Sequence, residues 1–143
     1  EDSVSKCLWT IWLLYIPELW STIEMGFKIH KSFFSTRDEV LEDLKKTGHW
    51  PTTYVSMESP ELPLHWHDLD VTGYVMSGGT YLLDEEGIRH ELTPGDKLEI
   101  PRGSLHAEGA VTVTTTYIVG TETPGHLLEQ LQMRPKEDPD RLS

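Results

Sequence analysis

Short β-forming segments separated by turn residues recur from Thr52 onward, and this pattern limits the fold more than any other feature. Turn signals return about every eight to twelve residues, which is typical of an all-β sandwich or barrel. Asp84-Glu85-Glu86-Gly87 has the composition of a hairpin turn. The strands that we expect are 53–58, 64–67, 71–77, 80–84, 88–92, 97–100, 105–108 and 111–119.

Three histidines fall on these predicted strands at informative spacings. His65 and His67 are separated by one residue, and His106 follows 39 residues later, after a Pro-x-Gly turn. Alternate residues of a strand point to the same face, so His65 and His67 project into one space. Three neutral imidazoles that converge inside a barrel form a site for a divalent transition metal. The alternative is a metal-free barrel with three satisfied polar residues. Burial of unsatisfied imidazoles costs free energy, which favours the metal site.

The segment that ends in His106 resembles the second motif of the cupin superfamily. Four residues match its fixed offsets: Gly95, Pro101, Gly103 and His106. Ala110 stands where the motif has Asn, and the first cupin motif matches at His65, His67 and Gly78. The resemblance implies a small single-domain cupin. Its fold would be all-β, a jelly-roll β-barrel with a short N-terminal helix and a short C-terminal helix or tail.

The metal-binding Glu of the first cupin motif is missing. Val71 stands at that position, or Thr72 if the spacing is one residue longer. The resemblance therefore implies a metal held by His65, His67 and His106. Such a site has a charge of +2, which favours an anionic ligand such as a carboxylate, an enolate or a thiolate.

Three carboxylates are candidates to replace the missing Glu, namely Asp68, Asp70 and Glu108, and for Asp68 a solvated loop between strands is the simpler interpretation. Asp70 is one residue away, so a small bulge would bring it inward as a fourth ligand. A solvated loop is the simpler interpretation of Asp70. Glu108 lies two residues after His106 and shares its strand face. It could be a ligand, a catalytic general base, or a partner that orients an imidazole.

The chain of 143 residues is long enough for one domain. Residues 35–47 read as a helix, capped by Thr36 and Glu39 and ended by Gly48. We expect a cupin domain over 25–125, with its barrel at 52–120, and a C-terminal helix and mobile tail over 126–143. Residues 1–24 are interpreted as an N-terminal extension outside the domain, the alternative being a swapped or membrane-touching arm.

Composition limits the partners. The formal net charge is −12, and no basic patch is present, so nucleic acid and anionic membrane surfaces are not expected to bind. The apolar run 7–16 is shorter than the about 20 residues of a membrane span. The lone Cys7 fits a reducing cytoplasm. Cupins commonly pair, so the resemblance implies a homodimer, for which Trp50 and Trp66 would suit the interface.

Two classes of function fit such a site. The first is a metalloenzyme, a dioxygenase or an isomerase or lyase, that acts on a small organic molecule. Iron would support oxygen chemistry, whereas zinc, nickel or manganese would support Lewis-acid chemistry. The second is a binding or sensing module without turnover. A redox-active metal with oxygen uptake favours the first class, and tight binding without turnover favours the second.

Overall fold

The computed structural model describes residues 26–129 and 132–142. Its elements are β1 (Lys28–His30), α1 (Arg37–Thr47), β2 (Trp50–Ser56), β3 (His65–Trp66), β4 (Val71–Ser77), β5 (Thr80–Leu83), β6 (Arg89–Leu92), β7 (Lys97–Ile100), β8 (Ala107–Glu108), β9 (Thr115–Thr121), α2 (Pro124–Glu129), β10 (Arg134–Pro135) and η2 (Pro139–Leu142). Within these two ranges, no helix combines the length and the apolar character that crossing a membrane requires.

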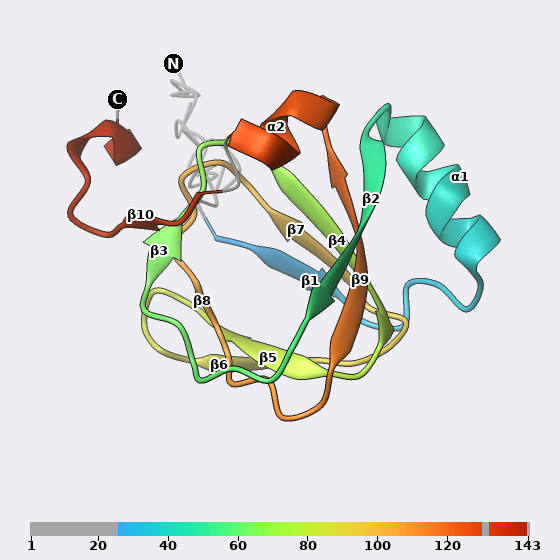
Figure 1. Cartoon of the computed structure of the whole chain (residues 1–143), viewed down its shortest axis with the longest axis horizontal. Helices are drawn as coiled ribbons and strands as arrows, with labels where there is room; N and C mark the ends of the chain where they lie inside the picture. Colours follow the sequence, from blue (N-terminus) through green and yellow to red (C-terminus); the bar gives the residue numbers. More distant parts are fainter. Residues whose placement is uncertain (1–25, 130–131, 143) are drawn as a thin grey trace, which may run out of the picture.

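The strands form two antiparallel sheets that face each other (Figure 1). The larger sheet has the order β1-β7-β4-β9-β2 and the smaller has the order β6-β5-β8. A third pair, β3 with β10, lies beside them. Helix α1 lies against the outside of the larger sheet (Figure 1). The predicted fold class, an all-β jelly-roll barrel with short flanking helices, is confirmed.

Strand β4 lies between two apolar clusters, and its alternating side chains contribute to one cluster on each face. Tyr74 points outward and packs beneath α1 with Val40 and Leu44. Val75 points inward and packs with Leu82 and Leu98 between the sheets. Alternate side chains of a strand face opposite sides, so one strand can contribute to both clusters. The inner cluster supports the wall of the barrel next to the candidate site.

Helix α1 begins and ends within two residues of the predicted limits. The Thr36 hydroxyl accepts a hydrogen bond from the Glu39 N–H, and the Glu39 carboxylate accepts one from the Thr36 N–H. This reciprocal capping satisfies N–H groups that the first turn leaves unpaired. Gly48 ends the helix with φ of 73°, a left-handed conformation that glycine adopts without strain.

The second motif contains a glycine at a turn that joins the two histidine segments. Gly103 has φ of 78°, and its N–H donates to the carbonyl oxygen of His67 at 3.0 Å. A side chain at this position would strain the backbone. The motif residue therefore holds the His106 segment against the segment of His65 and His67.

Some predicted limits differ from the structure. Strand β1 was not predicted, because three residues are too few to show a periodicity. The last long strand is β9 over Thr115–Thr121, not 111–119, because Thr112 to Thr114 form an exposed bend. β-branched residues fill the whole stretch and do not mark where pairing begins. Helix α2 starts at Pro124, a favourable first position, earlier than predicted. The predicted extension over 1–24 lies outside the described residues.

The C-terminal segment contacts the barrel. Strand β10 pairs with β3, the Trp66 Nε1–H donates to the Pro135 carbonyl at 3.1 Å, and Arg141 Nε donates to the Gly103 carbonyl at 3.0 Å. Trp66 is only 1% exposed, so the prediction that it contributes to an exposed dimer interface is wrong. The C-terminal residues, for which the sequence predicts a mobile tail, therefore pack against the barrel in the structure.

Candidate metal centre

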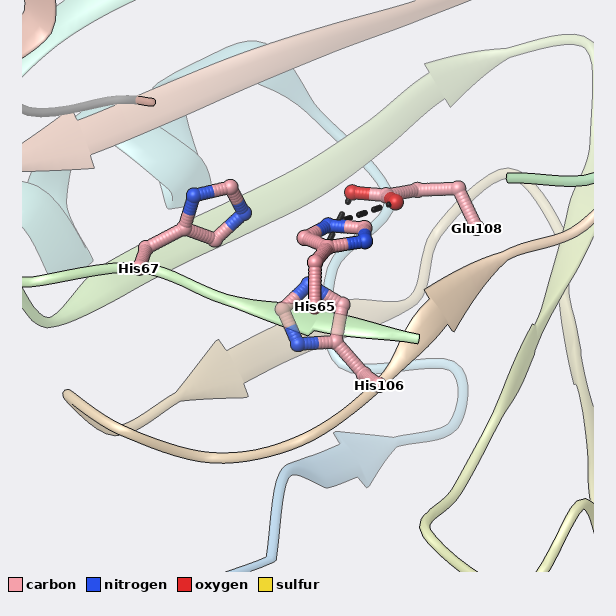
Figure 2. Close-up of side chains that lie close together, drawn as sticks. All are labelled: His65, His67, His106 and Glu108. Carbon is pink, nitrogen blue, oxygen red and sulfur yellow. Dashed lines mark ion pairs between the residues drawn. The ribbon is translucent and has the colours of Figure 1, made fainter. Parts of the chain in front are cut away.

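Four side chains converge where β3 meets β8 (Figure 2). They are His65, His67, His106 and Glu108, and one possible ligand atom from each lies within 4.8 Å of all the others. His65 and His106 form an antiparallel bridge, with N–H to O distances of 2.9 and 3.0 Å. The bridge sets these two rings side by side. Strand alternation then brings His67 and Glu108, each two residues further along, to the same side.

The backbone fixes the orientation of each imidazole. Nδ1 of His65 lies 2.7 Å from the Pro63 carbonyl oxygen, and Nδ1 of His106 lies 2.9 Å from that of Ser104. Nδ1 of His67 lies 3.1 Å from the Gln132 carbonyl oxygen. A carbonyl oxygen can only accept, so each Nδ1 carries the proton. In a neutral ring, the lone pair is then on Nε2.

The atoms at the centre of the group lack partners. His65 Nε2, His106 Nε2 and Glu108 Oε2 are buried, and none has an aligned hydrogen-bond partner in the described part of the chain. His65 Nε2 lies 3.0 Å from Glu108 Oε2, and His106 Nε2 lies 3.6 Å from Oε1. Lone pairs that face a carboxylate at this distance repel unless a proton or a cation lies between them. The donor set therefore fits a metal ion.

Burial and the neighbouring charges act in opposite directions on the pKa values of Glu108 and His65. Burial alone would raise the pKa of Glu108, but His106 and His65 lower it well below its usual range, so Glu108 is ionised. Burial acts to lower the pKa of His65, yet the Glu108 carboxylate beside it raises this pKa overall. Burial and then repulsion from His106 lower the pKa of His67 to about 4. His67 is therefore neutral at pH 7, as a metal ligand must be.

No protein-family model matches the chain, and neither does any curated protein. Solved structures do resemble it. A DUF861 family protein from Thermotoga maritima is 20% identical, with a TM-score of 0.50, over 67% of this chain and 99% of that chain. The polyketide cyclase RemF from Streptomyces resistomycificus is 25% identical, with a TM-score of 0.47, over 64% of each chain. A cupin superfamily protein from Desulfitobacterium hafniense is 14% identical, with a TM-score of 0.43, over 76% of this chain and 87% of that chain.

The fold is that of a cupin. The similarity rests on the arrangement of the strands, and at these identities it concerns the fold alone. The two facing antiparallel sheets and the histidine motifs on β3 and beside β8 agree with it.

The cupin barrel brings together the three predicted histidines and, of the three candidate carboxylates, Glu108. Asp68 instead pairs with the guanidinium group of Arg102. Asp70 is exposed, and its Oδ1 accepts a hydrogen bond from the Arg102 N–H at 2.7 Å. It does not belong to the group of four, and Val71 lines the adjoining cavity. The carboxylate beside the histidines thus comes from the second-motif strand.

A cavity of about 260 Å³ adjoins the group inside the barrel. His67 and Glu108 form part of its wall, so a molecule inside it would lie next to the candidate metal position. Gly73 also lines it, and a Cβ added there would lie 3.8 Å from Leu98, an ordinary contact distance. Tyr54 and Tyr117, whose position the sequence did not fix, both line this cavity.

Sequence reasoning missed the carbonyl groups that orient the imidazoles. Pro63 and Ser104 each precede their histidine by two residues, so this local pattern carries a detectable signal. Gln132 is 65 residues from His67, and no motif links the two. Its contribution depends on how the C-terminal segment packs.

Proposed function

We propose that this cupin binds one divalent transition metal ion through His65, His67, His106 and Glu108, and that a small organic anion reaches the metal through the adjoining cavity. The observation that supports this most directly is the set of buried atoms without hydrogen-bond partners, two Nε2 atoms and Oε2, at the centre of the group. Each imidazole already uses Nδ1 towards a backbone carbonyl, which leaves Nε2 for the metal.

The donor set favours a transition metal. Imidazole suits zinc, iron, nickel and copper, whereas calcium and magnesium prefer oxygen ligands. Three neutral imidazoles and one carboxylate leave a dication with a net charge of +1. This is lower than the +2 that follows from a site without a carboxylate. When bound, such an ion supplies Lewis-acid activation, and iron adds redox chemistry.

The residues around the metal would orient a ligand and exclude water. The cavity wall is mostly aliphatic, and apart from the hydroxyl groups of its lining its polar side chains are His67 and Glu108. With Glu108 used as a ligand, no further carboxylate among the described lining residues is available as a general base. We therefore propose that any turnover depends on metal activation of the substrate.

Elemental analysis of protein purified without chelators or added metal tests the proposal. We expect about one transition-metal ion per chain. Glu108→Gln keeps the shape and removes the charge, so metal affinity should fall by about tenfold or more. Asp70→Asn is the matched control and should leave affinity unchanged. If Asp70→Asn lowers the metal affinity and Glu108→Gln does not, the fourth ligand is Asp70 and not Glu108. Oxygen uptake with a redox-active metal would then indicate an oxygenase. Turnover without oxygen would indicate an isomerase or lyase, and ligand binding without turnover would indicate a sensing module.

We also propose that the protein pairs as a homodimer along β2. This strand is at an edge of the larger sheet and exposes Trp50 and Val55 by 56% and 48%. Exposed, apolar strand edges favour pairing with a second chain. Light scattering at micromolar concentration should give twice the monomer mass, and Trp50→Ser should shift it towards the monomer. A monomer mass for the unmodified chain would contradict this.

A further inference from the structure

The cavity beside the four side chains is apolar and contains no cationic side chain among the described residues that line it. Its aliphatic side chains come from strands of both sheets and from the segments between strands: Leu62, Val71, Leu82, Leu92, Leu98, Ile100, Val111 and Val119. The polar lining consists of hydroxyl groups and the two ligand candidates His67 and Glu108. An anion inside the cavity would therefore meet no Lys or Arg.

The cations next to the barrel are used elsewhere. Lys97 Nζ pairs with Asp43 Oδ2 at 2.7 Å on the α1 side of the larger sheet. Arg102 and Arg134 both pair with Asp68 outside the cavity. Among the groups that the described part of the chain places at the cavity, only the metal, at a net charge of +1, is left to neutralise a ligand. One negative charge is then compensated, whereas a second would stay buried in an apolar wall at a high cost in free energy.

The size of the cavity limits the body of the ligand. A cavity of about 150 Å³ lined by aliphatic and aromatic side chains holds one benzene molecule. The cavity here, at about 260 Å³, is large enough for a six-membered ring with a short side chain. Its aliphatic wall stabilises such a ring by the hydrophobic effect.

Tyr117 adds one polar contact inside this wall. Burial, followed by the charge of Glu108, raises the pKa of the Tyr117 hydroxyl to about 12, so the hydroxyl keeps its proton at pH 7. In the described ranges, no side chain or carbonyl forms a hydrogen bond with it. The hydroxyl is therefore available to donate to an oxygen atom of a ligand.

We infer that the ligand of this site is a small monoanionic acid with an apolar aromatic or branched aliphatic body, and that phosphorylated molecules are excluded. Tyr117 donates a hydrogen bond to the acid group or to a neighbouring oxygen, as a specificity-determining residue. The inference rests on the proposed metal site, because none of the described lining residues supplies a positive charge in place of the metal.

Three probes that differ in one property each test this selectivity on the cobalt-loaded protein. Phenylacetate is a monoanion with a ring, acetate lacks the ring, and phenyl phosphate keeps the ring but carries a second charge. Visible absorption bands of cobalt report metal uptake first and ligand binding second. We expect phenylacetate to bind at least about tenfold more tightly than either other probe. Phenyl phosphate binding as tightly as phenylacetate would overturn the inference, and so would equal binding of acetate.

Two variants test which residues of the cavity determine the choice of ligand. Tyr117→Phe should weaken phenylacetate by about fivefold or more without changing cobalt uptake, since it removes only the donor. Tyr81→Phe is the control and should change little, because the Tyr81 hydroxyl donates to Glu61 and Tyr81 does not line the cavity. Met133→Lys places a cation in the lining at a residue that is 54% exposed, and should improve phenyl phosphate binding severalfold. No gain for phenyl phosphate would mean that charge is not what excludes it.

The same experiment separates this inference from the proposed metal site. Protein that takes up no cobalt contradicts the proposed function, and the inference falls with it. Protein that takes up cobalt stoichiometrically but prefers phenyl phosphate leaves the metal site intact and overturns only the choice of ligand.

Discussion

Two groups of polar side chains lie on opposite sides of the larger sheet, and they differ in how their charges are paired. The outer cluster consists of Asp43, Tyr74, Lys97, Glu99 and His30. Within it, Lys97 pairs with Asp43 at 2.7 Å and lies 3.5 Å from Glu99. The Tyr74 hydroxyl donates to Asp43 at 2.5 Å, and His30 meets Glu99 at 2.7 Å. Every charge in the outer cluster has a partner from the chain itself.

The inner group of three histidines and Glu108 has no such internal cation. No Lys or Arg of the described chain lies among its central atoms, so the charge of Glu108 is balanced only by a protonated imidazole or by a bound cation. Charged groups inside proteins are normally paired, so the outer cluster needs no bound ligand to explain it and is part of the fold. The inner group is not explained in this way, and this contrast identifies the site more clearly than burial or pKa shifts alone. The two groups should therefore respond differently to the same kinds of mutation.

The largest expected effect is loss of metal from the inner group. His106→Ala removes a ligand whose side chain is fully buried, and metal affinity should fall by more than about 100-fold, beyond what loss of an orienting partner causes. His90→Ala is the matched control, because His90 pairs with Asp84 outside the group. Isothermal titration with zinc measures both. Equal affinities for the two variants would show that the inner group is another structural cluster.

The outer cluster should respond in stability rather than in metal binding. Lys97→Met leaves Asp43 without its cation, and removal of one partner of a buried pair costs about 3 kcal/mol of unfolding free energy. Metal affinity should stay unchanged, since Lys97 lies on the other side of the sheet. Lys45→Met, at an exposed position of α1, serves as the control and should change stability by less than about 0.5 kcal/mol. Urea denaturation gives both values, and similar losses for the two lysines would remove the distinction between the groups.

A pH titration of the metal-free protein sharpens the comparison further. The pKa of His67 is lowered to about 4, whereas an unfolded chain titrates His near 6.5. Between these values, the unfolded state binds more protons, so stability falls as the pH falls. The full shift corresponds to about 3 kcal/mol. The raised pKa of His65 acts in a different pH range, because the stability that it contributes is complete below about 6.5 and is lost as the pH rises above that value. His67→Gln should therefore make stability less dependent on pH between about 6.5 and 4. An unchanged slope would mean that His67 is not buried as a neutral ring.

The histidines were predictable because two local rules place them. Alternation sets His65 and His67 on one face, and the turn with Gly103 returns the chain to bring in His106. Alternation also puts Glu108 on the face of His106. Only the bridge between His65 and His106 shows that its carboxylate reaches both rings, and a bridge between distant segments has no sequence signal. Asp70 is nearer to the expected motif position, but the Arg102 N–H holds its carboxylate in the loop.

The C-terminal segment is the clearest case of a contact that only the structure provides, and it gives the smallest predicted effect. The Gln132 carbonyl accepts from His67 Nδ1, while the other two imidazoles use carbonyls two residues away in their own segments. Arg141 holds this segment through Gly103, so Arg141→Ala should loosen it and weaken metal binding by a few-fold at most. A chain that ends at residue 131 loses the carbonyl entirely, and its affinity should fall by about tenfold. Lys136→Ala, an exposed change in the same segment, should have no effect on titration with zinc. If the shortened chain binds zinc as tightly as the full chain, the carbonyl does not position His67, and water replaces it without cost.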